Sequence, residues 1–392
     1  MATPLRLAER DLDACVSCGL CLPHCPTFRA TGEEAYSPRG RIDAMRAVER
    51  DGLPIDAPFV EFMETCVQCR GCEPACPSGV PFGSLMADTR EALVSRRASV
   101  PWWQRPAYRL LRHHRALLAA STGLALAQRL RLVPRRIALP DLPLRRASPL
   151  VSTGDDVWLF TGCVMDAWQR DTHHATAALV GAVGGTYRVP GPGADCCGAL
   201  HHHAGLHAAT VATAESVIAS MPGDAPILVN SAGCGAALKE YGELLGTPAA
   251  AAFSGRVLDV HEWLAPRLGG LGDQGGDRPK VIVHDPCHLR HVQRAHLPVR
   301  TVLGEVADTV ELHDAGLCCG AGGAYSALEP EMAAAVRRRK VAAIRRAAEA
   351  SGATVVASAN PGCILHLRGE LDDIGIRHPI DIVAEALGLT PS

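Results

Sequence analysis

The chain lacks the features that place a protein across a membrane, outside the cell or on nucleic acid. Its 392 residues contain no run of about 18 apolar residues, so no membrane-spanning helix is expected. The first residues form neither an apolar signal core nor a twin-arginine motif, which predicts a cytoplasmic protein. The formal net charge is only −2, and without a basic excess we expect no nucleic-acid partner.

Familiar motifs for nucleotide binding and catalysis are also missing. No G-x-G-x-x-G segment follows a predicted strand, no Walker A motif occurs, and "GAGGAY" at 320–325 has the wrong spacing for a dinucleotide fingerprint. Neither G-x-S-x-G nor H-E-x-x-H occurs. We therefore expect no FAD or NAD on this chain, and we expect substrate oxidation to take place on a partner chain.

Cysteine is abundant, with 16 residues. In a reducing compartment so many cysteines indicate metal ligands or redox groups rather than disulfides. Eight of them form the run C-x2-C-x2-C-x3-C-P twice, which is the bacterial pattern for two iron–sulfur clusters. The fourth cysteine of each run ligates the other cluster. The pattern predicts two [4Fe–4S] clusters, the first held by Cys15, Cys18, Cys21 and Cys76, the second by Cys66, Cys69, Cys72 and Cys25.

The segment between the two runs reads as helical. Ser37 is a plausible N-cap and Pro38 a first-turn residue, followed by an apolar stripe at Ile42, Met45 and Val48. This predicts an α-helical ferredoxin-type domain over residues 1–90. Arg39 and Arg41 either offset the negative charge of the clusters or are ordinary surface cations.

The C-terminal part contains an internal duplication. "DVWLFTGC", "GADCCGA" and "PILVNSAGC" in the first copy correspond to "KVIVHDPC", "AGLCCGA" and "TVVASANPGC" in the second. Apolar strands alternating with helices predict parallel sheets. We expect two α/β domains, residues 151–272 and 278–392, called CCG domains after their Cys-Cys-Gly motif. The glycine-rich segment at 269–276 is the expected joint.

Each cysteine motif of the CCG domains follows a predicted strand. Ligands of parallel sheets bind at the carboxyl ends of the strands, so four thiols should converge in each domain. The first set is Cys163, Cys196, Cys197 and Cys234, and the second is Cys287, Cys318, Cys319 and Cys363. Either set can hold one further iron–sulfur cluster. A site without metal and a zinc site are the open alternatives.

Histidines gather beside these motifs, in "HHHAGLH" at 201–207 and "HDPCHLRHVQRAH" at 284–296. A histidine beside a cluster can ligate iron or carry protons. His288, which adjoins Cys287, is the first catalytic candidate, and His202 is the second. The alternative for each is an ordinary surface histidine.

Residues 91–150 form an arginine-rich helical connector. Between Arg96 and Arg146 the chain has twelve arginines, no lysine and a single acid, Asp141. Leucines recur at helical spacing, and Trp102 and Trp103 precede them. Two interpretations remain open: a helix with a solvated basic face, or a basic amphipathic surface that contacts anionic lipid or an acidic partner subunit.

The runs "CVSCGLCLPHCPTF" and "CVQCRGCEPACPSGVPFG", with "SPRGRI" between them, resemble the iron–sulfur subunits of bacterial glycolate oxidase. The two CCG copies resemble domains of those subunits, of heterodisulfide reductases, and of lactate and anaerobic glycerol-3-phosphate dehydrogenases. The resemblance implies an electron-transfer subunit that takes electrons from FAD-containing oxidase subunits and passes them toward the respiratory chain. It leaves open a contact with a quinone and a peripheral contact with the cytoplasmic face of the membrane.

The reductases themselves usually carry a fifth cysteine in each CCG copy. Here Ser231 and Asn360 stand at that position, which disfavours the alternative of a heterodisulfide-reductase-like catalyst. A lactate or glycerol-3-phosphate dehydrogenase subunit is the other alternative.

Overall fold

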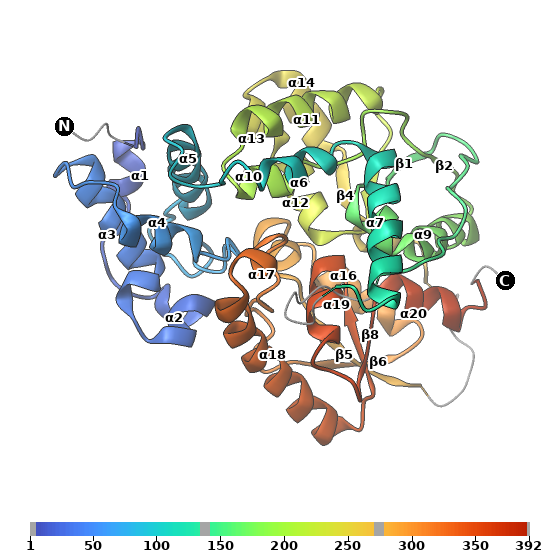
Figure 1. Ribbon diagram of the computed structural model, residues 1–392. Coiled ribbons are helices and arrows are strands. Elements are labelled where there is room, and N and C mark those ends of the chain that lie inside the picture. Colours follow the sequence, from blue (N-terminus) through green and yellow to red (C-terminus); the bar gives the residue numbers. More distant parts are fainter. Residues whose placement is uncertain (1–4, 134–141, 270–277, 390–392) are drawn as a thin grey trace.

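A computed structural model describes residues 5–133, 142–269 and 278–389 (Figure 1). The N-terminal domain is helical, as predicted, and lies to one side of the two CCG domains. Its elements are α1 (Glu9–Asp13), 3-10 helix η1 (Leu22–His24), α2 (Pro26–Thr31), 3-10 helix η2 (Glu34–Tyr36), α3 (Pro38–Glu49), α4 (Ala57–Glu64) and α5 (Phe82–Ser95).

Helix α3 begins as the sequence predicts. The Ser37 hydroxyl accepts a hydrogen bond from the Gly40 amide at 2.9 Å, and Pro38 occupies the first turn. The expected apolar stripe is buried in the core of this domain. Gly40 also permits a close approach, because a Cβ there would lie 2.1 Å from the Glu34 carbonyl oxygen. The helix therefore packs tightly against η2, beside the cysteine loops.

The connector forms two short helices, α6 (Arg105–Leu110) and α7 (His114–Arg129). The turn between them divides the leucines, which recur at helical spacing in the sequence, between two helices. Leu117 packs against Cys163 and Cys196 of the first CCG domain, and the Trp168 indole donates to Ser121 at 3.1 Å. One face of the connector is thus buried rather than solvated. Pro134, Pro140 and Asp141 lie outside the described residues.

The first CCG domain contains a four-stranded parallel sheet in the order β2-β1-β3-β4. Its strands are β1 (Val157–Phe160), β2 (Tyr187–Arg188), β3 (Ile227–Val229) and β4 (Val257–Asp259). Its helices are α8 (Val164–Trp168), α9 (Arg170–Ala182), α10 (Ala199–His203), α11 (His207–Ser220), α12 (Ala232–Lys239), α13 (Tyr241–Leu245), α14 (Pro248–Gly255) and α15 (Val260–Leu264).

The second CCG domain repeats this topology in the order β6-β5-β7-β8, which confirms two α/β domains with parallel sheets. Its strands are β5 (Lys280–His284), β6 (Asp308–Glu311), β7 (Val355–Ser358) and β8 (Gly375–Arg377). Its helices are π-helix η3 (His288–Val292), α16 (Leu297–Gly304), α17 (Tyr325–Leu328), α18 (Pro330–Ser351), α19 (Pro361–Arg368) and α20 (Pro379–Ala386).

The two CCG domains share a hydrophobic core. Leu179 of α9 and Ile380 of α20 belong to one buried cluster that also contains residues of both sheets. The Thr172 hydroxyl donates to Asp381 at 3.0 Å across this interface. The pair is therefore held together by direct packing, whereas most of the expected joint at 269–276 lies outside the described residues. In residues 5–133, 142–269 and 278–389, no helix is long and apolar enough to cross a membrane.

Candidate iron–sulfur sites

Four cysteines of the first predicted set line one cavity of the N-terminal domain. Three come from the loop between α1 and η1, and Cys76 comes from the end of the second run. Gly19 turns this loop with a φ of +82°, a conformation that side chains disfavour. Arg39 lies over the loop and donates to the Ser17 carbonyl at 2.9 Å. The cavity thus gathers Cys15, Cys18, Cys21 and Cys76, and Cys72 lines it as well as the second cavity.

A second cavity gathers the other predicted set, Cys25, Cys66, Cys69 and Cys72. Pro26 starts α2 directly after Cys25, so the chain leaves the first loop and carries this cysteine to the second. The backbone amide of Gln68 points at Cys66 Sγ at 3.4 Å. The fourth cysteine of each run therefore lines the cavity formed by the other run.

These thiol sets suit the cofactor implied by the motif. Four cysteines around one space match the ligation of a [4Fe–4S] cluster. In the described ranges no three His, Cys, Asp or Glu side chains gather around a single-ion position. In a zinc site, all thiolate sulfur atoms lie about 2.3 Å from a single ion. In a [4Fe–4S] site, the thiolates are spread over the surface of the cube-shaped cluster.

Arg41 is buried beside the second cavity, with only 1% of its surface exposed. Its guanidinium donates to the Phe62 carbonyl at 2.6 Å and to the Thr27 hydroxyl at 3.2 Å. Burial raises the pKa of the Cys25 thiol, and the charge of Arg41 opposes this rise. Arg41 is therefore placed to favour a thiolate. Arg39 is more exposed and pairs with Glu34.

The structure brings the four cysteines of the first CCG domain together at the carboxyl ends of its strands. Cys163 Sγ lies 3.8 Å from Cys196 Sγ, and Cys197 Sγ lies 3.2 Å from Cys234 Sγ. The Tyr241 hydroxyl donates to the Cys197 carbonyl at 2.8 Å and fixes this loop. Contact with Cys196 and burial raise the pKa of the Cys163 thiol, so metal binding would have to displace a proton.

The second CCG domain repeats this geometry. Cys287 and Cys318 have their sulfur atoms 3.9 Å apart, and those of Cys319 and Cys363 are 3.2 Å apart. Asn360, at the position of the missing fifth cysteine, donates to Cys363 Sγ at 3.4 Å. Its carbonyl oxygen accepts from the Gly233 amide of the first domain at 3.3 Å. The substitution thus supports one thiol and links the two copies.

The second CCG site contacts a ferredoxin-type cysteine directly. Cys69 and Cys318 belong to one buried cluster with Tyr325, whose hydroxyl donates to the Thr65 carbonyl at 3.0 Å. Contact with Cys318, followed by burial, raises the pKa of the Cys69 thiol well above its ordinary value. No sequence pattern signals this contact, because the two cysteines are far apart in the chain.

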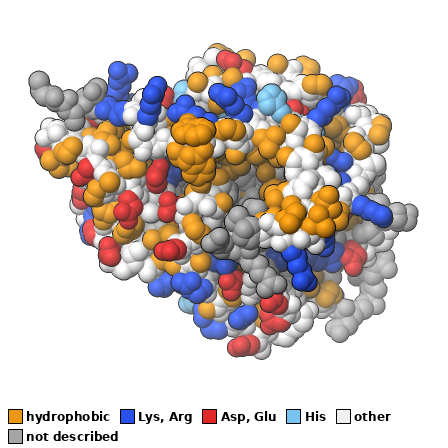
Figure 2. Space-filling view, viewed as in Figure 1, with side chains coloured by type: hydrophobic (Ala, Val, Ile, Leu, Met, Phe, Trp, Pro, Cys, Tyr) orange, Lys and Arg blue, Asp and Glu red, His pale blue; other side chains and the backbone are white. Residues whose placement is uncertain are grey.

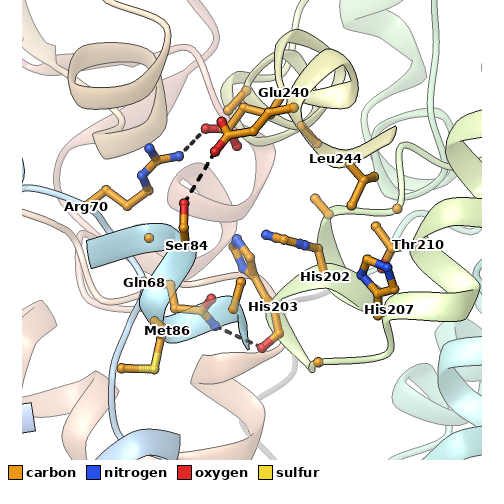
Figure 3. Close-up of a pocket in the computed structure, with 18 of the residues that line it drawn as sticks. Gln68, Arg70, Ser84, Met86, His202, His203, His207, Thr210, Glu240 and Leu244 are labelled. Carbon is orange, nitrogen blue, oxygen red and sulfur yellow. Dashed lines mark hydrogen bonds and ion pairs between the residues drawn. The ribbon is translucent and has the colours of Figure 1, made fainter. Parts of the chain in front are cut away.

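A larger cavity of about 320 Å³ lies where the N-terminal domain meets both CCG domains (Figure 3). The two histidine candidates, His202 and His288, both line it. Between them lies His203, whose ring centre is 5.4 Å from that of His288 and 6.4 Å from that of His202. His203 was not among the predicted candidates, although its place in a run of three histidines was a signal.

His202, His203 and His288 are held neutral. Burial lowers the pKa of His202 and His203, and burial with the nearby Arg70 charge lowers that of His288 to about 4. Arg70 does not remain a free cation, because it pairs with Glu73 at 2.8 Å and with Glu240. Neutral imidazoles can accept or donate hydrogen bonds to a ligand.

Comparison with known protein families supports the motif analysis. The family described as "4Fe-4S dicluster domain" matches residues 11–80, and the one described as "Cysteine-rich domain" matches 157–239 and 281–368. These matches confirm iron–sulfur cofactors as the class of prosthetic group.

Three relatives align over almost the whole chain. The probable glycolate oxidase iron–sulfur subunit of Bacillus subtilis is 32% identical over 98% of this chain and 96% of the relative. The glycolate oxidase iron–sulfur subunit of Escherichia coli is 31% identical over 97% and 95%. One subunit of the dihydromethanophenazine:CoB–CoM heterodisulfide reductase of Methanosarcina barkeri is 27% identical over 97% and 95%. The resemblance inferred from the motifs is confirmed.

Proposed function

The chain belongs to the family of glycolate oxidase iron–sulfur subunits, and we propose from this premise that it is the electron-transfer subunit of a glycolate-oxidising complex. FAD-containing partner subunits oxidise glycolate to glyoxylate, and this chain passes the electrons toward the respiratory chain. The observation that carries the proposal is the pair of cavities, each lined by all four cysteines of one predicted set and each built from both cysteine runs. Glycolate is preferred to lactate or glycerol 3-phosphate because two relatives above 30% identity carry that name.

We assign one [4Fe–4S] cluster to Cys15, Cys18, Cys21 and Cys76, and the other to Cys66, Cys69, Cys72 and Cys25. Such clusters supply one-electron transfer at potentials within about −700 to +450 mV, set by charge, hydrogen bonds and burial. Arg39 and Arg41 provide positive charge at the two cavities. The Gln68 amide provides a hydrogen bond to sulfur. These residues are the means by which this chain sets the two potentials.

We propose a further cluster at the second CCG site. The support is the contact between Cys69 and Cys318, which joins this site directly to the second ferredoxin-type cavity. Adjacent thiol sets are the arrangement that electron transfer between neighbouring centres requires. The π-helix η3 begins directly after Cys287, and such irregular helices are frequent at functional sites. The first CCG site, with the same four thiols, is the next candidate.

Reduction by glycolate tests this function. The chain is co-produced anaerobically with its FAD-containing partner, and glycolate is expected to bleach the visible absorption of the clusters. Iron analysis should give about eight irons per chain from two clusters, and about twelve with the second CCG site loaded. The same chain without the partner should contain the same iron and fail to respond to glycolate. Colourless, iron-free protein, or bleaching by dithionite but not by glycolate in the complex, would contradict the proposal.

We also propose that the connector contacts the anionic cytoplasmic surface of the membrane. Trp102 and Trp103 are 81% and 61% exposed, and Leu126, Leu130 and Leu132 are exposed as well. Figure 2 shows hydrophobic side chains gathered over one end of α7, near basic side chains. Residues 96–133 contain eight arginines and no acid. Exposed tryptophan beside arginine suits the headgroup region of an anionic bilayer, since indole rings bind there and guanidinium groups attract phosphate.

Vesicle sedimentation checks this contact. The full chain should sediment with phosphatidylglycerol vesicles and not with phosphatidylcholine vesicles. Replacing both tryptophans with alanine should weaken binding about tenfold, because their buried apolar area is lost. Leu297→Ala removes an equally exposed apolar residue from the second CCG domain and should leave binding unchanged. Equal sedimentation of the double variant and the wild type would rule out the connector as the contact.

A further inference from the structure

The cavity of about 320 Å³ is separated from the second ferredoxin-type cavity by a thin wall. Gln68, Arg70 and Phe82 line both spaces. The cavity is also lined by Cys197 of the first CCG site. A molecule bound there would therefore be within one layer of residues of the proposed cluster at Cys25, Cys66, Cys69 and Cys72. No part of the proposed function accounts for this space.

The charges of the cavity disfavour anionic ligands. Asp88, Glu91, Glu240 and Glu243 line it, and its one arginine is paired with two carboxylates. His207 at the rim adds positive charge only when it is protonated, and it lies 3.6 Å from Glu91. Repulsion would disfavour the carboxylate of glycolate, lactate or a similar substrate. A neutral ligand meets no such penalty.

The remaining lining suits a flat, largely apolar molecule with a few polar atoms. Phe82, Met86 and Leu244 provide apolar surface, and His202, His203 and His288 provide polar edges. The volume lies at the lower end of the range for small-molecule sites.

We propose that this cavity binds the head group of a quinone and is the site at which the electrons leave the chain. The inference rests on the proposed function, because glycolate oxidation supplies the electrons. Two electrons and two protons convert the two quinone carbonyl groups to hydroxyl groups, as glycolate loses two electrons and two protons to become glyoxylate. The electrons arrive through the iron–sulfur sites across the shared wall. The protons enter from solvent at the rim, where Asp88 and His207 are exposed.

Ligand binding can be measured without turnover. The probe is 2-heptyl-4-hydroxyquinoline N-oxide, a quinone analogue whose fluorescence is quenched on binding, titrated into the full iron-loaded chain. Saturable binding is expected for the wild type. Ala87→Phe, which fills the cavity from α5, and Leu244→Trp, which fills it from α13, should each weaken binding at least tenfold. Ala249→Phe, at an exposed position of α14, is the matched control and should bind within twofold of the wild type.

The outcomes separate this inference from the proposed function. A variant with the same iron content as the wild type has folded. One folded cavity-filling variant is enough to test the inference. Absence of saturable binding to the wild type, or unchanged binding by a folded cavity-filling variant, would overturn the quinone site. Reduction of an artificial dye by glycolate in the wild-type complex tests the proposed function alone. Dye reduction without probe binding would reject the quinone site and support the proposed function. Probe binding without dye reduction would support a ligand site in the cavity and reject the proposed function.

Discussion

Replacing Cys76 with alanine is expected to remove the cluster whose other three ligands lie about 55 to 61 residues away, while the cluster beside Cys76 in the sequence survives. The reason is that Cys76 lines the cavity of Cys15, Cys18 and Cys21, and not that of Cys66 and Cys69. Iron should fall by about four per chain, and glycolate-driven electron transfer should fall by several orders of magnitude. Iron analysis and electron paramagnetic resonance of the reduced protein measure both effects.

Double variants distinguish crossed from uncrossed ligation. If the ligation is crossed, Cys21→Ala with Cys76→Ala disrupts a single cluster and leaves about four of the eight irons, whereas Cys21→Ala with Cys25→Ala disrupts both. Uncrossed ligation predicts the opposite pair of results. The two double variants remove the same number of thiols, so each is the control for the other. Loss of both clusters from the first double variant alone would refute the assignment.

Replacing Arg90 with leucine is expected to give the largest loss of stability. The Arg90 guanidinium donates to the carbonyls of Met63, Glu64 and Cys66 at 2.8, 2.9 and 2.9 Å, and to that of His203 at 2.7 Å. It thereby joins the second cysteine loop to the first CCG domain. Leucine would leave these four carbonyls without this donor. Removing one partner of a buried charged interaction costs about 3–5 kcal/mol, and we expect a loss of that size.

Thermal unfolding followed through the visible absorption of the clusters measures this loss. Arg90→Leu should lower the temperature at which the signal disappears by about 10 °C, given about 2–4 °C per kcal/mol in a protein of this type. Arg10→Leu is the control, because the Arg10 side chain is 88% exposed and its ion pair is with the neighbouring Asp11. A shift of less than about 2 °C for Arg90→Leu would mean that water replaces the guanidinium without cost.

Gly205 gives independent support for the contact that Arg90 makes. It has a φ of +73°, and a Cβ at this position would lie 2.5 Å from the Arg90 carbonyl carbon and oxygen. The backbones of α5 and of the turn after α10 therefore approach more closely than any other residue would allow. Arginine and glycine together hold the N-terminal domain against the first CCG domain, on the edge of the large cavity.

Local features of the fold were predictable from sequence. Ser37 and Pro38 marked the start of α3, and the alanine-rich stretch at 332–350 lies within α18. The strands that lead to cysteines were also recognisable as β-branched runs. Strands β4 and β8 were not, because no cysteine motif follows either of them and each is defined by pairing with β3 or β7. The connector was expected to be helical, but its division into α6 and α7 and its burial against Cys163 depend on the neighbouring domain.

The sequence alone determined the cofactor class and the duplication, and it predicted the pairing of distant cysteines, since these depend on residue type and spacing along one chain. Tertiary structure decided how those parts meet: Cys69 against Cys318, Arg90 against four carbonyls, and three histidines around one cavity. Such contacts depend on how separate elements pack in three dimensions. The residue spacing within a segment constrains ligands that share a loop, but it does not predict which surface of a folded domain becomes buried against another domain.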